Sequence, residues 1–184
     1  AMLELAAQGG HAELLRWLLR HKGSDVVLAP AAVAAARGGH IAALEVLWAW
    51  GGRAVLDFHD AGNALHMAAT CGQLSSVKWL LDHSADPRLR VAGGSAGGCE
   101  ALHLVAIQGQ ATVAQTFLDA RADVNVANSQ GSPPLHLAAF HGHGAVADIL
   151  LRARASVLRR DAFQMTALHQ ATLRGCAPLA VALL

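Results

Sequence analysis

The chain has 184 residues, of which 54% are hydrophobic, 4% aromatic and 15% charged, and its formal net charge is +1. This length allows one compact domain or a short repeat array with a continuous core. The composition excludes a global field that would attract nucleic acid or an acidic membrane surface, and no stretch reaches the roughly 18 consecutive apolar residues of a membrane span.

The first two predicted helix pairs cover residues 3–19 (LELAAQGGHAELLRWLL) and 32–48 (AVAAARGGHIAALEVLW). Both contain an alanine-rich stretch, then Gly-Gly-His, then a stretch rich in leucine and alanine. In the first pair, Leu3 and Glu4 occupy the positions that a Leu-His dipeptide takes in the later units. We interpret both segments as weaker copies of the repeat that follows.

Four stronger copies come next, and each contains a Leu-His dipeptide. The dipeptides start at Leu65, Leu102, Leu135 and Leu168, at intervals of 37, 33 and 33 residues, and a glycine stands seven residues after each leucine. A fixed period of this length is the signature of a repeat architecture. The chain is therefore predicted to contain about six helix-turn-helix units in one domain, covering approximately residues 1–27, 28–55, 56–88, 89–125, 126–158 and 159–184.

Residues 133–155 show why one unit should form two antiparallel helices. Pro133 or Pro134 suits the first turn of a helix, where the missing N–H costs nothing. Gly142 then ends this helix in the left-handed conformation that glycine adopts most easily. Helical spacing predicts that the buried residues are Leu135, Ala138 and Ala139 on the first helix and Val146, Ile149 and Leu150 on the second. One pair cannot bury its apolar face alone, so the pairs must stack.

The sequences GSPPLHLAAFHGH (131–143) and ADILLRARASV (147–157) resemble the ankyrin repeat, whose signature is a Thr-Pro-Leu-His helix start, an Ala-Ala pair, Gly-His, a leucine triplet and Gly-Ala-Asp-Val-Asn. The resemblance covers about residues 2–184 and is strongest in the last four units. It implies an all-α repeat solenoid, in which helix pairs form a right-handed stack and short β-hairpin or loop fingers project at right angles.

Departures from the family pattern carry further expectations. Five residues are missing between Val27 and Ala32, so the first finger is expected to be lost, whereas VAGGSAGG (91–98) lengthens the third junction and is expected to be mobile. The glycine that usually closes the second helix is replaced by Lys22, Ser84, Arg121 and Arg154. Gly23 is expected to take over this role in the first unit, and each of the other three replacements to cost about 1 kcal/mol if the backbone there is left-handed.

Seven of the eleven histidines recur at two positions of the repeat. The first set is His66, His103, His136 and His169, and the second set is His11, His40 and His143. The ankyrin resemblance implies that the first set forms hydrogen bonds near the helix start and across to the neighbouring repeat. A metal site in LHLAAFHGH (135–143) is disfavoured, because offsets of five and seven residues do not place His136, His141 and His143 on one helix face. Within this stretch, His141 alone belongs to neither set.

Motifs for catalysis, cofactors and metals are missing from the chain. It has no G-x-x-x-x-G-K-[ST] or H-E-x-x-H sequence and no dinucleotide fingerprint. Its three cysteines, Cys71, Cys99 and Cys176, are dispersed and form no C-x-x-C pair, which is typical of a reducing compartment. We therefore predict no catalytic, cofactor-binding or metal-binding residues, and an intracellular protein that is cytoplasmic by default, with the nucleus left open.

The remaining candidate is a binding surface. By resemblance to the family, partners bind the concave side, which is formed by the finger tips and by the variable residues after the Ala-Ala pair. Several of these positions are apolar although the scaffold does not need them, which suggests contact with a partner; packing against neighbouring finger residues or cover by flanking sequence is the alternative. The predicted partner-binding residues are Thr70, Cys71, Ile107, Gln108, Phe140, His141, Leu173 and Arg174 on first helices and His59, Gln130, Phe163 and Met165 on finger tips.

The tryptophans are assigned by their register. Trp17 and Trp79 fall at leucine-triplet positions and are predicted to lie in the core, whereas Trp50 follows a helix end and is predicted to be partly exposed.

Two functions fit these observations. One is a non-catalytic protein–protein interaction module that binds another protein through the concave groove. The alternative is an intramolecular regulatory or spacer domain that docks against another domain of the same chain. Neither requires nucleic acid, metal or membrane insertion, and a metal- or nucleotide-dependent enzyme is the least supported hypothesis. Because neither end carries the polar terminal repeat that repeat proteins need for solubility, we expect a segment of a longer polypeptide.

Overall fold

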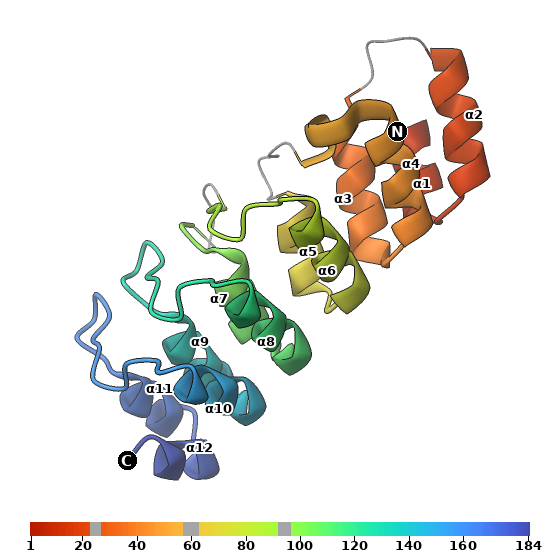
Figure 1. The fold of residues 1–184 in the computed structure, drawn as a ribbon. Helices are drawn as coiled ribbons and strands as arrows, with labels where there is room; N and C mark the ends of the chain where they lie inside the picture. Colours follow the sequence, from red (N-terminus) through yellow and green to blue (C-terminus); the bar gives the residue numbers. More distant parts are fainter. Residues whose placement is uncertain (23–26, 57–62, 92–96) are drawn as a thin grey trace. The chain divides into compact units, whose positions relative to one another are not determined.

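The computed structural model describes residues 1–22, 27–56, 63–91 and 97–184. Within these ranges it contains twelve α-helices, one short 3-10 helix and no β-strand (Figure 1). The chain divides into two compact units, Ala1–Asp86 and Pro87–Leu184, and each unit contains three helix pairs. The predicted all-helical repeat stack is thus confirmed, whereas the extension of one domain over residues 1–184 stays a prediction.

In the first unit, the helices of successive pairs form two rows. The first helices of the pairs make one row, in which α3 packs between α1 and α5, and the second helices make the other, in which α4 packs between α2 and α6. The elements are α1 (Met2–Gln8), α2 (Ala12–Lys22), α3 (Ala29–Gly38), α4 (Ile41–Gly51), the 3-10 helix η1 (Gly52–Leu56), α5 (Ala64–Thr70) and α6 (Leu74–Asp82). Buried alanines such as Ala32, Ala35 and Ala36 let the first helices approach closely.

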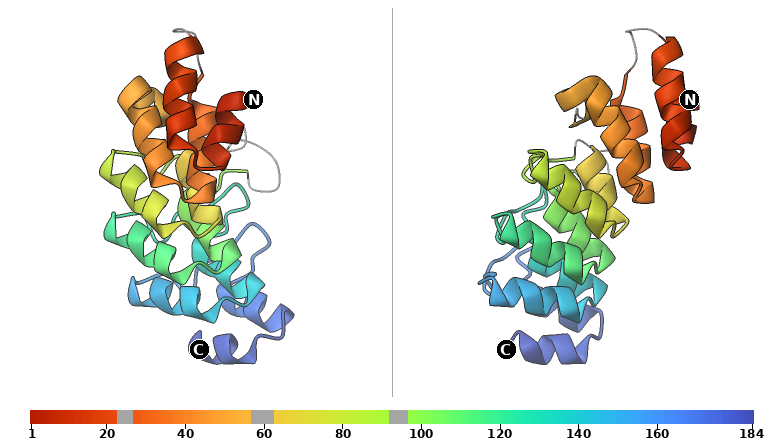
Figure 2. Two further views of the ribbon diagram at one scale, coloured as in Figure 1. Left: turned by 90° about the vertical axis from the view of Figure 1, so that its right-hand side faces the viewer. Right: turned by 45° about the vertical axis from the view of Figure 1, so that its right-hand side comes forward.

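The second unit repeats this arrangement (Figure 2). Here α9 packs between α7 and α11, and α10 packs between α8 and α12. The helices are α7 (Ala101–Gln108), α8 (Ala111–Asp119), α9 (Pro134–His141), α10 (Gly144–Arg152), α11 (Ala167–Leu173) and α12 (Ala177–Ala182). Each helix is too short to be stable alone, so the stacking of apolar faces supplies its stability.

The buried faces of α9 and α10 follow the predicted spacing with one exception. Leu135, Ala138 and Ala139 on α9 are fully buried, as expected. On α10, however, the buried residues are Val146, Ala147 and Leu150, while Ile149 is half-buried. Ile149 therefore lies at the edge of the apolar stripe, and the small Ala147 occupies the centre of the contact.

The turn inside each pair is made by glycine, as the repeat pattern predicts. The glycines that end the first helices, Gly10, Gly39, Gly72, Gly109, Gly142 and Gly175, all have φ between 67° and 76°. A second constraint acts at Gly109, where an added Cβ would lie only 2.6 Å from Nδ1 of His143 in the next pair. Glycine at this position thus permits both the left-handed turn and the approach of the neighbouring pair.

The second set of histidines connects successive pairs. The Nε2–H group of His143 donates to the carbonyl of Ile107 at 2.9 Å, and that of His40 donates to the carbonyl of Gln8 at the same distance. Both acceptors lie near the end of the first helix in the preceding pair, where carbonyl groups lack helical partners. These histidines therefore belong to the fold rather than to a metal site.

The first set of histidines lies at the start of the first helices, as the family resemblance implies. The backbone N–H of Glu100 donates to Nδ1 of His103 at 3.1 Å, and the same contact joins Thr166 to His169. In α9 the corresponding residue is Pro133, which has no N–H to donate. His136 instead uses its Nε2–H group, which donates to the carbonyl of Met165 at 3.0 Å.

The tryptophan predictions are only partly right. Trp17 is 57% exposed and stacks on His21, so its assignment to the core was wrong. The inner face of α2 is filled by Leu15, Leu18 and Leu19, which leaves the Trp17 position on the outer side. Trp79 is half-buried and stacks on His83, whereas Trp50 is 49% exposed, as predicted.

Two further expectations cannot be compared with the structure. The cap role of Gly23 and the extended junction of residues 91–98 fall wholly or mostly outside the described residues. For the first junction, the structure describes Val27 and Leu28, which lead directly into α3.

The turns after the second helices offer a test of backbone strain. Ser84, Arg121 and Arg154 have φ of 65°, 61° and 64°, the left-handed conformation anticipated at these positions. Replacing the exposed Arg154 by glycine removes backbone strain of about 1–2 kcal/mol from the folded state. Glycine also makes the unfolded chain more flexible, which offsets roughly half of this gain in stability. We therefore expect Arg154→Gly to raise the free energy of unfolding by about 0.5–1 kcal/mol in a urea titration.

Ala153 provides the matched control, because it adjoins Arg154 and has a φ of −80°. Ala153→Gly relieves no left-handed strain and is expected to lower stability by about 0.5–1 kcal/mol. Equal destabilisation by both substitutions would contradict the strain argument.

Candidate partner-binding groove

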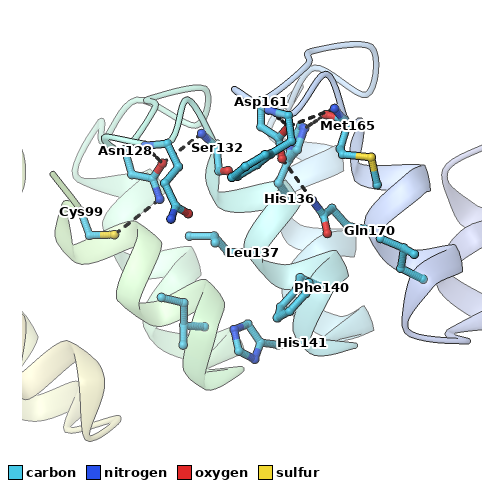
Figure 3. Close-up of a pocket in the computed structure, with 14 residues that line it drawn as sticks. Cys99, Asn128, Ser132, His136, Leu137, Phe140, His141, Asp161, Met165 and Gln170 are labelled. Atoms are coloured by element: carbon cyan, nitrogen blue, oxygen red, sulfur yellow. Dashed lines mark hydrogen bonds between the residues drawn. The ribbon is translucent and has the colours of Figure 1, made fainter. Parts of the chain in front are cut away.

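The second unit contains a cavity of about 700 Å³, hereafter the groove. Its fourteen lining residues come from the first-helix side of the three pairs, namely from α7, α9, α11 and the segments that precede them (Figure 3). Six lining residues are large and apolar: Ile107, Leu137, Phe140, Phe163, Met165 and Leu173. A concave, mainly apolar surface with a few polar groups is the common form of a ligand site.

Seven of the twelve predicted partner-binding residues line the groove: Ile107, Gln130, Phe140, His141, Phe163, Met165 and Leu173. Arg174 lies beside it, because its Nε–H group donates to the carbonyl of Phe140 at 3.1 Å and its guanidinium carbon is 4.8 Å from the centre of the Phe140 ring. Gln108 ends α7, directly after Ile107, but does not line the cavity. The structure thus brings together residues from three repeats of the second unit.

The other predicted residues lie elsewhere. Thr70 is the last residue of α5 and Cys71 follows it as an exposed cap, both in the first unit. His59 lies outside the described residues, so the structure says nothing of its position.

Two loops form the upper wall of the groove, and each is organised by one side chain. Asn128 Oδ1 accepts hydrogen bonds from the backbone N–H groups of Gln130 and Ser132, both at 3.0 Å. Asp161 Oδ1 accepts from the N–H groups of Phe163 and Met165, both at 2.9 Å. These are the turn-forming bonds that Asn and Asp favour, and they hold both loops in the same shape.

The two loops are also joined to each other and to the helices. The backbone N–H of Ala162 donates to the carbonyl of Gln130 at 2.9 Å. Gln170 on α11 donates through Nε2 to Asp161 Oδ2 at 3.1 Å, so both carboxylate oxygens have donors (Figure 3). The loops correspond to the predicted fingers, although the described residues contain no strand in them.

Asn128, Asp161 and Gln170 were not among the site residues predicted from the sequence. The spacing of Asn128 and Asp161 was a usable signal, because they lie 33 residues apart, as do Leu135 and Leu168. A turn-forming residue repeated at the period of the fold indicates a repeated loop conformation. Gln170 offered no such signal, because its role depends on where α11 meets the loop.

The rim of the groove exposes apolar surface. Phe163 is 70% exposed, Leu173 68% and Phe140 38%, although all three are large apolar side chains. The core of the second unit is completed without them by residues such as Phe117, Leu135 and Leu150. Exposed apolar residues that gather at a cavity are typical of interaction sites.

Two titratable groups of the groove, His141 and Cys99, are uncharged at pH 7. Burial, together with the neighbouring His143 and Arg174, holds the pKa of His141 below its ordinary value of 6.5. Burial also raises the pKa of the Cys99 thiol above 9.0, against the opposing effects of Asn128 and Arg90. His141 can therefore donate or accept one hydrogen bond, and Cys99 contributes an uncharged wall.

Within the part of the chain that the structure describes, no three or more histidine, cysteine, aspartate or glutamate residues are grouped so that they could hold a metal ion. Among the described helices, none has the length and hydropathy needed to cross a membrane.

Comparison with known families agrees with this architecture. A family model described as ankyrin repeats (three copies) matches residues 3–91 and 102–184. The chain belongs to the ankyrin repeat family. Ankyrin repeats are in general protein-interaction modules and are in general not catalytic. The Leu-His dipeptides, the left-handed glycines and the paired helices of this chain are therefore ankyrin features.

One similarity extends to a longer protein. An 84-residue part of this ankyrin chain is 34% identical to diacylglycerol kinase iota of Homo sapiens, and the match covers 46% of the chain and 8% of the kinase. The likeness therefore concerns a small part of the kinase.

Proposed function

We propose that this chain is a non-catalytic protein-interaction module that binds a partner polypeptide in the groove of the second unit. The observation that carries the proposal is the exposure of Phe140, Phe163 and Leu173 around one cavity. Burying such side chains contributes about 25 cal/mol for each Å² of apolar surface removed from water. Aromatic side chains at the centre of an interface commonly carry much of its binding energy.

The hydrogen-bonded loops support this proposal, because they present the binding side chains in a fixed geometry. The backbone N–H groups of Phe163 and Met165 donate hydrogen bonds to the Asp161 carboxylate. The side chain of Gln170 donates a further hydrogen bond to the same carboxylate. A preorganised surface loses less conformational entropy on binding than a flexible one.

The proposal extends to the remaining predicted residues. Gln108 and Arg174 would contact the same partner beside the groove, and Thr70, Cys71 and His59 would contribute contacts from the first unit. Intracellular location and the absence of nucleic-acid, metal and cofactor partners remain part of the proposal.

The double variant Phe140→Ala, Phe163→Ala tests the groove. Peptides would first be selected from a random display library on the wild-type protein, and their affinities measured by fluorescence anisotropy. Because both rings are exposed, we expect a loss of affinity of at least about tenfold with little change in the thermal unfolding midpoint.

Leu158→Ala serves as the control, because Leu158 is a large apolar residue of the same unit that is 82% exposed and does not line the groove. It should retain full affinity. A large drop in stability of the double variant would show that the two rings belong to the core, and equal loss of binding in the control would place the contact elsewhere.

The alternative function is a regulatory or spacer domain that docks against another domain of its own chain. The match to 8% of a much longer kinase favours this alternative specifically. An adjoining kinase, channel or transferase domain in the full reading frame would support it. Its test is competition: the longer chain should bind the selected peptides more weakly than residues 1–184 if its own segment occupies the groove.

A further inference from the structure

The charges of the second unit are distributed unevenly between its two sides. Of its five carboxylates, three are exposed and lie on or after the second helices: Asp119, Asp123 and Asp148. The other two, Glu100 and Asp161, belong to the first-helix side that carries the groove, and they are only 5% and 3% exposed. None of the three exposed carboxylates lines the groove, and the one carboxylate that does, that of Asp161, is buried.

Both carboxylates on the groove side are also engaged. Asp161 accepts bonds from two backbone N–H groups and from Gln170. Glu100 lies 3.5 Å from Arg90 in an ion pair. Neither group is free to bind a cation from a partner without losing these bonds, and losing them would cost free energy.

A cation does stand at the groove. Arg174 follows α11, is exposed, and is fixed by the bond from its Nε–H group to the Phe140 carbonyl and by stacking over the Phe140 ring. This bond uses Nε–H and not the two terminal guanidinium nitrogens, and a carboxylate is the acceptor that matches their planar fork. The adjacent imidazole of His141 adds a hydrogen-bonding group that carries no negative charge.

We propose that the groove of the second unit selects a peptide segment that combines bulky apolar side chains with an acidic residue placed against Arg174. This inference rests on the proposed function and names the chemistry of its partner. The apolar side chains of the peptide cover Phe163, Leu173 and Met165, and its carboxylate pairs with Arg174. A basic peptide meets the Arg174 charge and finds no exposed carboxylate among the residues that line the groove, so it is rejected.

The first experiment reads the composition of peptides selected from a random display library on the wild-type protein. Peptides whose binding is lost in Phe140→Ala, Phe163→Ala are classed as groove-dependent. We expect these to be enriched in aspartate or glutamate together with large apolar residues, relative to the unselected library.

The second experiment uses one selected peptide in three synthetic forms: with its acidic residue, with the corresponding amide, and with lysine. The acidic form should bind wild-type protein about tenfold more tightly than the amide form, and the difference should shrink as salt is added. Arg174→Gln should abolish the difference between the two forms, and Arg174→Lys should restore part of it, because lysine keeps the charge but not the fork.

Arg152→Gln is the matched control, since Arg152 is an exposed arginine at the end of α10, on the other side of the unit. It should leave the preference for the acidic form unchanged. Groove-dependent peptides that are neutral or basic, or a preference that survives Arg174→Gln, would overturn this inference while the proposed function stands. A selection that yields no groove-dependent peptide would overturn both.

Discussion

Replacing Phe117 by alanine is expected to lower the free energy of unfolding of the second unit by about 3–5 kcal/mol. Phe117 lies on α8, has no exposed surface and is the largest of the fully buried side chains. Its removal forfeits the transfer free energy of the ring and leaves a cavity among helices that cannot collapse fully.

The magnitude follows from the architecture as well as from the side chain. In a stacked repeat each pair contacts only its neighbours, so α8 depends on α7 and α10 for its burial. A cavity at α8 therefore weakens its contacts with both α7 and α10. The measurement is chemical denaturation followed by circular dichroism.

Gln115→Ala is the control on the same helix. Gln115 is exposed and bonds only to the exposed Asp119 among the described residues, so its loss is expected to change stability by no more than about 0.5 kcal/mol. A loss below about 1 kcal/mol for Phe117→Ala would mean that the second unit is not packed as described.

Acid is expected to destabilise the second unit through His103. Burial lowers the pKa of this imidazole to about 4, from an ordinary value of 6.5, and the smaller effects of nearby backbone groups at Ser132, Val126 and Glu100 oppose the shift while Arg90 adds to it. The ring is fully buried, and a charge there would be separated from water.

The direction of the pH effect follows from proton binding. Between pH 6.5 and 4 the unfolded chain holds the His103 proton and the folded chain does not, so stability is complete above pH 6.5 and falls as the pH drops through this window. This difference between the two pKa values corresponds to a loss of about 3 kcal/mol in the free energy of unfolding at the acid end of the window. Burial also lowers the pKa of His136, so this residue contributes to acid destabilisation in the same direction.

His103→Gln isolates this contribution. The variant is expected to lose less stability between pH 7 and 4 than wild type. The slope of its unfolding free energy against pH should be smaller, by an amount that corresponds to the uptake of up to one proton on unfolding. Gln115→Ala, which removes no imidazole, should retain the wild-type slope. Identical slopes for wild type and His103→Gln would show that His103 does not titrate as described.

Much of the fold could be predicted because its determinants are local. The helix pairs follow from apolar residues at helical spacing, and the turns at Gly109 and Gly142 follow from glycine's access to the left-handed region. The structural role of His143 was foreseeable because it recurs with the Gly-His pattern, although its acceptor, the Ile107 carbonyl, was not.

The candidate site was predicted in part. Phe140, Phe163 and Leu173 were identified because they are apolar at positions that the repeat leaves variable, and the structure brings them to one cavity. Whether they bind a partner stays a proposal. Trp17 was misassigned because its register alone does not tell which side of α2 is covered by a neighbour.

The sequence by itself determined the period, the helix pairs, the left-handed turns and the histidine positions, because each depends on residues within one repeat or on their regular recurrence. Only the tertiary structure decided that Asp161 is buried and bonded to Gln170, that Arg174 stacks on Phe140, and that the exposed carboxylates of the second unit do not line the groove. These features arise where loops and helices of different repeats meet, and their geometry is set by packing between segments that local propensities do not encode.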